Sequence, residues 1–211
     1  MARYTGPSCR LCRAERAQLF LKGDRCKGPK CPITKKMGPP GRGPRTRMKK
    51  ISDYGVQLRE KQKLKRLYGM LEKQFKIVFN HAARQTGITG ENLIRLLESR
   101  LDNIVYRMRF APSRKMARQI VSHGHIYVNG RRVNIPSYHV KENDKIEVRD
   151  SSKKLIVIKE ALKEYSKSGI VPWLNIDPDN MIGTVTSLPR RSDVTDLAHI
   201  KEQLIVELYS K

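Results

Sequence analysis

The sequence contains no long apolar run, few acidic residues and few aromatic ones. Of its 211 residues, 38% are hydrophobic, 6% are aromatic and only 20 are Asp or Glu. A membrane-spanning helix needs about 20 consecutive apolar residues. No such stretch occurs, so we expect no membrane span. No apolar signal region follows the opening "MARYTGPSCR", which predicts a cytoplasmic protein with reduced thiols.

The scarcity of acidic residues leaves a large excess of positive charge. Lys and Arg number 44, and the formal net charge is +24. Residues 1–50 carry 15 cations against 2 acidic side chains, residues 51–150 carry 20 against 10, and residues 151–211 carry 9 against 8. Such an excess opposes compaction unless a polyanion neutralises it. Nucleic acid is the leading partner and a membrane surface is the alternative, met mainly by the first two thirds of the chain.

Cysteine is absent after residue 31. Cys9, Cys12, Cys26 and Cys31 have the spacing Cys-x2-Cys-x13-Cys-x4-Cys. A two-residue gap lets two thiolates face one ion, and a second pair completes a tetrahedron, as in structural zinc sites. The clustering argues against disulfides and against four unrelated buried thiols. The spacing also allows an iron–sulfur cluster. Because the segment has few apolar residues, metal binding would supply its folding energy.

The segment "KKMGPPGRGPRTRMKK" that follows is rich in Gly, Pro and cations. Gly and Pro oppose a helix, and the charges oppose a core. The segment is therefore either an extended linker lying on an anion or a disordered tether.

Helical periodicity begins at Ser52, the expected N-cap of a helix that ends at Gly69. Its inward face is predicted to hold Tyr54, Leu58, Leu64 and Leu67, and its outward face to hold Arg59, Lys61, Lys63, Lys65 and Arg66. A second helix is expected over residues 71–85 and a third after Thr89. Their predicted core residues are Phe75, Val78, Phe79, Ala82, Leu93, Leu96, Leu97 and Leu101.

The stretch "SRKMARQIVSHGHIYVNGRRV" combines a short basic helix with a hairpin. Ser113 is the expected N-cap of a helix over 114–123, and Gly124 is its left-handed end. Asn129-Gly130 is a strong hairpin signal, and a strand follows over 145–148. Cations from the helix and the hairpin would face one groove and contact phosphates. His123 and His125 could form a metal pair, but no third ligand lies nearby in sequence.

The near-neutral tail is expected to be scaffold or a face toward neighbouring proteins. Residues 151–167 predict an amphipathic helix with inward Leu155, Ile158, Leu162 and Tyr165. Trp173 is expected to be a core anchor. The segments "GTVTSLP" and "EQLIVELYS" are predicted to be strands.

The helix–hairpin stretch resembles the small RNA-binding module shared by ribosomal protein S-four, certain pseudouridine synthases, a heat-shock RNA-binding protein and tyrosyl-tRNA synthetases. "SDYGVQLREKQKLKRLYG", "LLESRLDNIVYRMRFAPSRKMARQIVSHGHIYVNGRRVNIPSY", "VPWL" and "EQLIVELYSK" extend the resemblance over nearly the whole chain to the bacterial S-four family of small-subunit ribosomal proteins, in its four-cysteine, zinc-binding variant. Lys201 departs from the Asn common in that family, which puts one local contact in doubt.

The resemblance implies an α+β fold with a small metal-bound N-terminal knot, a helical lobe and an inserted helix–helix–β-hairpin RNA-binding lobe. The expected domains are residues 1–45, residues 46–99 with 190–211 and a C-terminal strand, and residues 100–189. The implied function is to bind the 5′ domain of small-subunit ribosomal RNA, nucleate assembly of the subunit body and influence decoding accuracy. Expected partners are that RNA, neighbouring ribosomal proteins and messenger RNA at its entry region, with no membrane and no small-molecule substrate.

The residues expected to contact RNA are cations with a few polar neighbours. They are Arg3, Arg10, Arg13, Lys22, Lys30, Arg42, Arg45, Arg47, Lys49, Lys50, Arg59, Lys61, Lys63, Lys65, Arg66, Arg100, Arg107, Arg114, Lys115, Arg118, His123, His125, Asn129, Arg131 and Arg132. The expected cofactor is structural Zn²⁺, with an iron–sulfur cluster as the alternative. An RNA-modifying enzyme would need a catalytic domain with a buried Asp or similar residue, for which no segment is left. A zinc-finger DNA-binding regulator would need a recognition helix, which the cysteine segment does not display.

Overall fold

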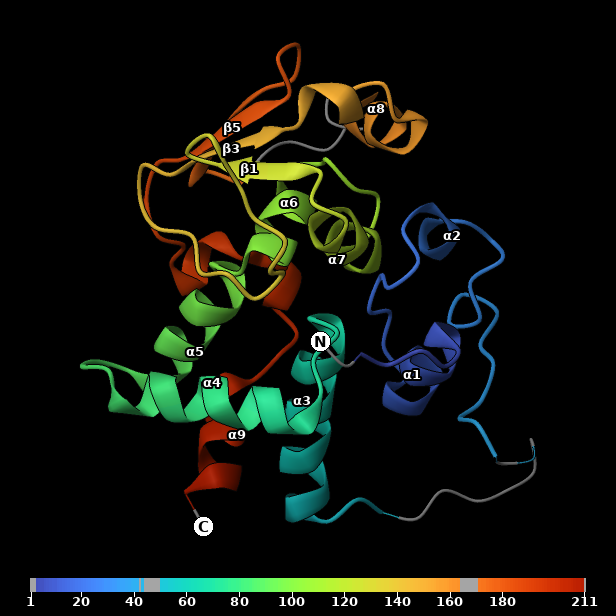
Figure 1. Cartoon of the computed structure of the whole chain (residues 1–211). Helices are drawn as coiled ribbons and strands as arrows, with labels where there is room; N and C mark the ends of the chain where they lie inside the picture. The colour runs from blue at the N-terminus through green and yellow to red at the C-terminus, as the bar shows by residue number, and fades with distance from the viewer. Residues whose placement is uncertain (1–2, 42, 44–49, 164–170, 211) are drawn as a thin grey trace. The chain divides into compact units, whose positions relative to one another are not determined.

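The computed structural model describes residues 3–41, 43, 50–163 and 171–210. The chain divides into two compact units, residues 1–90 with 196–211 and residues 91–195. The regular elements in the described part of the first unit are all helices, and the second unit combines helices with an antiparallel sheet (Figure 1). The expected α+β class is confirmed, while the three-part division of the chain stays a prediction.

The first unit contains α1 (Ser8–Glu15), α2 (Asp24–Lys27), α3 (Asp53–Leu67), α4 (Glu72–Arg84), the start of α5 (Thr89–Glu98) and α9 (Glu202–Tyr209). The Ser52 hydroxyl accepts from Gly55 N at 3.3 Å and caps α3 as predicted. Gly69 follows the helix with φ +63°. The four predicted core residues of α4 are all buried. The Tyr209 ring of α9 stacks on Phe79 with ring centroids 4.4 Å apart.

Two predictions about the first unit are wrong. The segment "EQLIVELYS" is a helix, α9, and not a strand. Ile205 is buried and Tyr209, four residues later, stacks on α4, so the helical period rather than the alternation of apolar letters governs its packing. On α3, Tyr54 is 60% exposed whereas Lys61 is only 8% exposed, the reverse of the prediction.

The polar face of α3 is buried because α9 packs against it with polar partners. The Gln57 amide donates to Glu207 Oε2 at 3.0 Å, and the backbone N–H of Lys201 donates to Glu60 Oε2 at 3.2 Å. Buried polar groups need such bonds, since leaving one unpaired costs about 1–3 kcal/mol. Leu64 and Leu67 are buried as predicted.

The second unit is built on a five-stranded antiparallel sheet with the order β2-β1-β3-β5-β4. The strands are β1 (Ile126–Val128), β2 (Arg131–Arg132), β3 (Lys145–Val148), β4 (Leu174–Asp177) and β5 (Ile182–Val185). Helices α6 (Leu101–Arg107) and α7 (Arg114–Ser122) lie against one face of the sheet (Figure 1). Apolar residues at alternate positions of β1 and β3 enter the shared core, with Val128 opposite Ile146 and Ile126 opposite Val148.

The local signals of the helix–hairpin stretch are confirmed. Ser113 accepts from Met116 N at 3.3 Å and caps α7. Gly124 has φ +73°, as a left-handed helix end requires. Asn129 and Gly130 both have positive φ, +50° and +74°, which is the type I′ geometry that matches strand twist.

The tail of the second unit differs from its predicted single helix. A 3-10 turn, η1 (Asp150–Ser152), precedes α8 (Ile156–Lys163), and another, η3 (Arg191–Asp193), follows the sheet; η4 (Thr195–Leu197) begins at the last residue of this unit and continues into the first. Ile158 is buried as expected, but Leu155, which lies before the helix begins, is 40% exposed; Tyr165 is outside the described residues. Trp173 is 1% exposed in the core, as predicted. No helix in the described ranges has the length and apolarity to span a bilayer.

Candidate nucleic-acid interface

The outward cation row predicted on α3 is held by carboxylates of the same unit. It comprises Arg59, Lys61, Lys63, Lys65 and Arg66. Arg59 and Arg66 both contact Glu15 Oε1 of α1, and Lys63 contacts Glu60. The ammonium groups of Lys61 and Lys65 lie 2.7 and 2.9 Å from the two oxygens of Glu72. The row therefore serves to join α1, α3 and α4, and an RNA role for it stays a prediction.

Glu15 connects the cysteine segment to α3. Its side chain is fully buried. Burial raises the pKa of this carboxyl, while Arg66 and Arg59 oppose the rise. Two guanidinium groups on one buried carboxylate fix α1 against α3.

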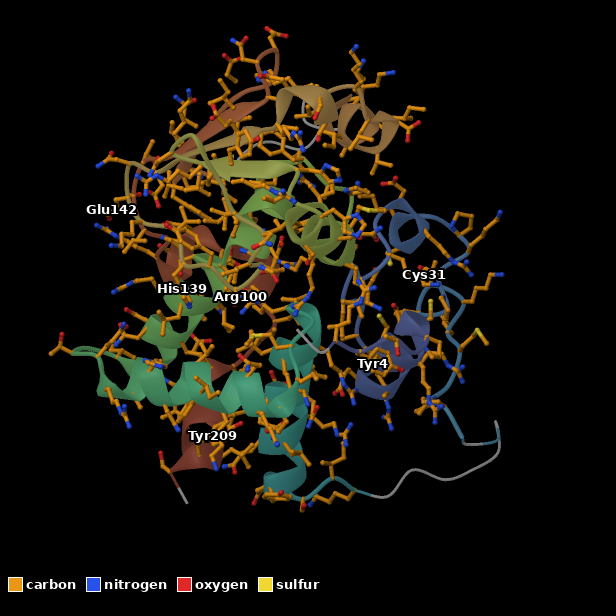
Figure 2. The ribbon with its side chains drawn as sticks, in the orientation of Figure 1. Tyr4, Cys31, Arg100, His139, Glu142 and Tyr209 are labelled. Carbon is orange, nitrogen blue, oxygen red and sulfur yellow. The ribbon has the colours of Figure 1, made fainter. Side chains whose placement is uncertain are left out.

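A second set of predicted RNA-binding arginines lies beneath the surface of the second unit. Arg100 makes a two-pronged pair with Asp102, Nε to Oδ1 at 3.0 Å and Nη2 to Oδ2 at 2.8 Å. Arg118 Nη1 lies 3.4 Å from the same Oδ2. Figure 2 shows Arg100 and His139 close together, consistent with the isolated bridge between their backbones. Because Arg100 is 3% exposed, its guanidinium acts inside the fold.

Arg107 and Arg114 are held by buried polar partners in a similar way. The fully buried Glu98 side chain receives two bonds from Arg107, at 3.0 and 2.8 Å. Asn103 donates to Glu98 Oε2 and accepts from Arg114 Nε, both at 2.8 Å. The Arg114 guanidinium also lies 4.6 Å from the Tyr106 ring centroid, within cation–π range. These arginines form a buried network that fixes α6 and the start of α7, with Lys115 half-buried beside it.

Three buried carboxylates, one in the first unit and two in the second, also bear on enzyme activity. A catalytic Asp or Glu must reach its substrate in a usable protonation state. Glu15, Glu98 and Asp102 are instead each bonded to at least one arginine within the fold. None of the three is available for such chemistry.

The predicted contact Asn129 has an internal role as well. Its Nδ2 donates to Asp144 Oδ1 at 2.8 Å, and its Oδ1 accepts from the backbone N–H of Lys145 at 2.9 Å. These two bonds tie the hairpin turn to β3.

The remaining predicted cations are differently placed. Within the described residues, the side chains of Arg131 and Arg132 on β2 are exposed and have no carboxylate partner. The same holds for five cations around the cysteine segment and before α3: Arg3, Arg10, Lys22, Lys30 and Lys50. Arg13 donates to Gly38 O at 2.7 Å. Arg42, Arg45, Arg47 and Lys49 lie outside the described residues.

Sequence reasoning missed Arg149, which directly follows β3 and is exposed. Its backbone N–H donates to His125 O at 2.9 Å, so it lies beside the predicted groove. Its position next to a predicted strand was visible in "KIEVRD", but its proximity to His125 depends on the pairing of β1 with β3.

The four cysteines are free thiols; Cys9 and Cys12 lie on α1 and Cys26 on α2, while Cys31 follows α2 (Figure 2 labels Cys31). Burial raises the pKa of Cys12, an N–H of Leu19 lowers it, and the other three cysteines raise it further. Backbone N–H groups also point at sulfur, with Lys22 N 3.4 Å from Cys26 Sγ. At Cys31 the donors of Thr34 and Ile33 outweigh burial and lower the pKa.

The donor set therefore suits a thiophilic cation, since four sulfurs interact and N–H groups stabilise thiolates. Across the residues the structure describes, however, no three Cys, His, Asp or Glu side chains are gathered into a formed metal-binding group. The metal site stays a prediction.

The chain combines helices and an antiparallel sheet with exposed cations that have no carboxylate partner among the described residues. These features define the class of basic nucleic-acid-binding proteins. Residues 3–98 match the model of the ribosomal protein S4/S9 N-terminal domain, and residues 99–146 match that of the S4 domain. The chain is 55% identical over 211 residues to the small ribosomal subunit protein uS4 of Geobacter sp. (strain M21). It is 56% identical to that of Trichlorobacter lovleyi and 54% identical to that of Acidothermus cellulolyticus. Each match covers the whole of both chains.

The chain belongs to the uS4 family of bacterial small-subunit ribosomal proteins. This confirms the family inferred from the sequence motifs, while the zinc-binding variant stays a prediction. Members of the family are structural RNA-binding proteins, so the chain is not an enzyme.

Proposed function

We propose that this chain binds small-subunit ribosomal RNA and is a structural constituent of the small ribosomal subunit in the cytoplasm. The observation that carries the proposal is the division of its cations into two sets. The buried arginines of the second unit pair with internal carboxylates, whereas exposed arginines on β2 have no such partner among the described residues. The names of the relatives support the same assignment.

The physical mechanism is neutralisation of backbone phosphates with release of counterions. A net charge of +24 drives association with any RNA. Preference for one RNA comes from its shape and its 2′-hydroxyls, because phosphate contacts alone carry little sequence information. The buried ion pairs of α6 and α7 hold the contacting surface in one conformation, which lowers the entropy cost of binding.

The finer proposal concerns where the chain binds. By family resemblance we expect the 5′ domain of the ribosomal RNA, with a role in nucleating the subunit body. Neighbouring ribosomal proteins and messenger RNA at its entry region are the further expected contacts, with an influence on decoding accuracy. The near-neutral tail suits contact with proteins better than contact with RNA, since residues 151–211 carry 9 cations against 8 acidic side chains.

Sedimentation of a cell lysate through a sucrose gradient tests the proposal. In magnesium-containing buffer, the chain should migrate with small subunits and remain there at moderate salt. After magnesium chelation and high salt, it should move to the top of the gradient, because the RNA unfolds and phosphate contacts weaken. A chain that stays at the top under every condition would contradict the proposal.

We also propose that the four cysteines hold one structural Zn²⁺. Four thiolates would leave no open position for water, so the ion would fold the segment and take no part in chemistry. The mutual pKa effects of the thiols and the N–H donors to sulfur support this assignment. An iron–sulfur cluster remains the alternative.

Elemental analysis of the purified full-length chain should find about one zinc per chain, and an absorption spectrum without visible bands would exclude the iron–sulfur cluster. Cys26→Ser should release the metal and expose residues 3–41 to protease, while the second unit stays resistant. Serine is close to cysteine in size but cannot supply a thiolate, so the comparison isolates the ligand. Equal zinc content and equal protease resistance in both proteins would refute the site.

A further inference from the structure

A cavity of about 420 Å³ lies within the second unit, and its lining residues are outside the helix–hairpin stretch. The lining comes from four segments: α5, the turn before β3, the two residues before β4 and the chain that follows β5. The volume falls in the range of small-ligand sites, about 300–1,000 Å³. The sequence gave no sign of the cavity because these segments meet only in the folded unit.

Hydrogen bonds between the segments fix the wall of the cavity. The backbone N–H of Thr186 donates to Trp173 O at 3.1 Å. Two residues later, Leu188 N donates to Glu142 Oε1 at 3.0 Å (Glu142 is labelled in Figure 2). The chain after β5 is therefore held both to the start of β4 and to the turn before β3, so the cavity has a defined shape.

The charged side chains of the wall differ in whether they already have partners. The two oxygens of Asp193 accept from the Arg190 backbone N–H at 2.9 Å and from the Ser192 hydroxyl at 3.0 Å. Glu142 also accepts a backbone bond. In contrast, the guanidinium groups of Arg95 and Arg190 have no carboxylate partner among the described residues. The groups of the wall that remain for a ligand are thus the cationic ones.

A third donor without a partner belongs to Trp173. Its side chain lines the cavity and is 1% exposed, and its Nε1 N–H is buried without an acceptor in the part of the chain that the structure describes. Buried indole N–H groups usually find an acceptor, because an unpaired buried donor is unfavourable. An acceptor oxygen on a bound ligand would relieve that cost.

The wall favours a compact anion over a polyanion. Its lining residues carry two cationic and two acidic side chains, so their formal charges cancel. A nucleic-acid backbone gains no net attraction there, because its successive phosphates would also meet the carboxylates. A single carboxylate group can contact the guanidinium groups alone, and its planar pair of oxygens matches their fork of donors.

We propose that this cavity binds a carboxylate group, with Arg95 and Arg190 as its cationic contacts and the Trp173 N–H as a neutral donor. The carboxylate belongs either to a free organic acid or to an acidic side chain of a neighbouring protein. The inference goes beyond RNA binding, since none of its contacts requires a nucleic acid.

Titration of the full-length chain with two carboxylates tests the site. Succinate is the free acid, and the peptide acetyl-Gly-Glu-Gly-amide presents one carboxylate on a protein-like backbone. Sodium chloride at matched ionic strength controls for screening by salt. Trp173 is the single tryptophan of the chain, so its fluorescence and the one indole N–H signal in a proton–nitrogen NMR spectrum both report on the cavity. At least one of the two probes should shift these signals and saturate in the millimolar range, as expected of so small a ligand.

Substitutions in the wall should change the affinity in opposite directions. Arg190→Gln should weaken binding about tenfold, because it removes a charge-assisted pair; this side chain is exposed, so the variant should fold. Glu142→Gln should strengthen binding severalfold, because its amide oxygen can still accept from Leu188 N while the negative charge is lost. Lys154→Gln, an exposed cation of the same unit that does not line the cavity, is the matched control and should bind like the wild type.

The outcomes separate the source of the carboxylate from the existence of the site. Tighter binding of succinate would assign the cavity to a free acid, and tighter binding of the peptide would assign it to a neighbouring protein. Inorganic phosphate is the competing probe, and its tighter binding would overturn the carboxylate class. The site is refuted if neither carboxylate shifts the indole signal beyond the chloride control, or if Arg190→Gln responds like the wild type. Sedimentation with small subunits judges the proposed function separately, because these titrations contain no RNA.

Discussion

Replacement of Asp102 by Asn should sharply destabilise the second unit. Asp102 is 8% exposed as a side chain, and its two oxygens receive Arg100, which is 4% exposed, in addition to Arg118. The amide keeps one acceptor but directs an NH₂ group toward a guanidinium N–H. Arg100 is then a buried cation without a counter-charge.

The magnitude follows from the cost of breaking a buried pair, about 3–5 kcal/mol when one partner is removed. For a unit of this size each kcal/mol lowers the midpoint of thermal unfolding by about 4–8 °C. A loss of about 3 kcal/mol should thus lower the midpoint by at least about 12 °C.

Urea unfolding followed by tryptophan fluorescence provides the assay. Trp173 is the single tryptophan of the chain and is 1% exposed in the core of the second unit, so the signal reports on this unit. Asp179→Asn, an exposed aspartate of the same unit, is the control and should change stability by less than about 0.5 kcal/mol.

The double variant Asp102→Asn with Arg100→Met separates the causes. If the uncompensated charge is responsible, removal of that charge should recover part of the lost stability. The reasoning is refuted if Asp102→Asn costs under about 1 kcal/mol, or if the double variant is less stable than the single one.

Two further predictions concern the first unit and the hairpin. Partial burial opposes ionisation of Glu72, but bonds from Lys61 and Lys65 outweigh it and lower its pKa to about 2. The ionised carboxylate therefore stabilises the folded state above the ordinary pKa near 4.5, and this stability should be lost as the pH falls toward 2. Acid unfolding followed by circular dichroism should show that Glu72→Gln is less sensitive to acid than the wild type. Asn129→Ala should cost about 1–3 kcal/mol, because Asp144 loses its 2.8 Å donor and the turn residue has positive φ; an unchanged urea midpoint would show that the turn does not need this side chain.

Local structure was predictable where one or two residues dictate the backbone. The Ser113 cap, the left-handed Gly124 and the Asn129-Gly130 turn were all inferred from the sequence and all occur. Each depends on interactions within about four residues, so no knowledge of distant partners was needed. The buried face of α4 was also correct, since apolar spacing alone defines it.

Which cations are exposed for RNA binding and which are paired within the fold was not predictable in the same way. Lys61 and Arg100 look like surface charges in the sequence, yet both are buried against carboxylates. Conversely, nothing in the segment "KIEVRD" marks Arg149 as a neighbour of His125. Charge pairing depends on which elements pack together, and the helical character of 202–209 followed from packing on α3 and α4 rather than from its own letters.

The sequence by itself determined the family, the excess of positive charge, the clustered cysteines and the local turns and caps, because these depend on composition and on residues close in the chain. Only the tertiary structure decided which cations hold the protein together and which remain for RNA. The physical reason is that a buried arginine needs a carboxylate brought from elsewhere in the fold. The exposed arginines of β2 have no such partner in the described chain, and a phosphate can take that place.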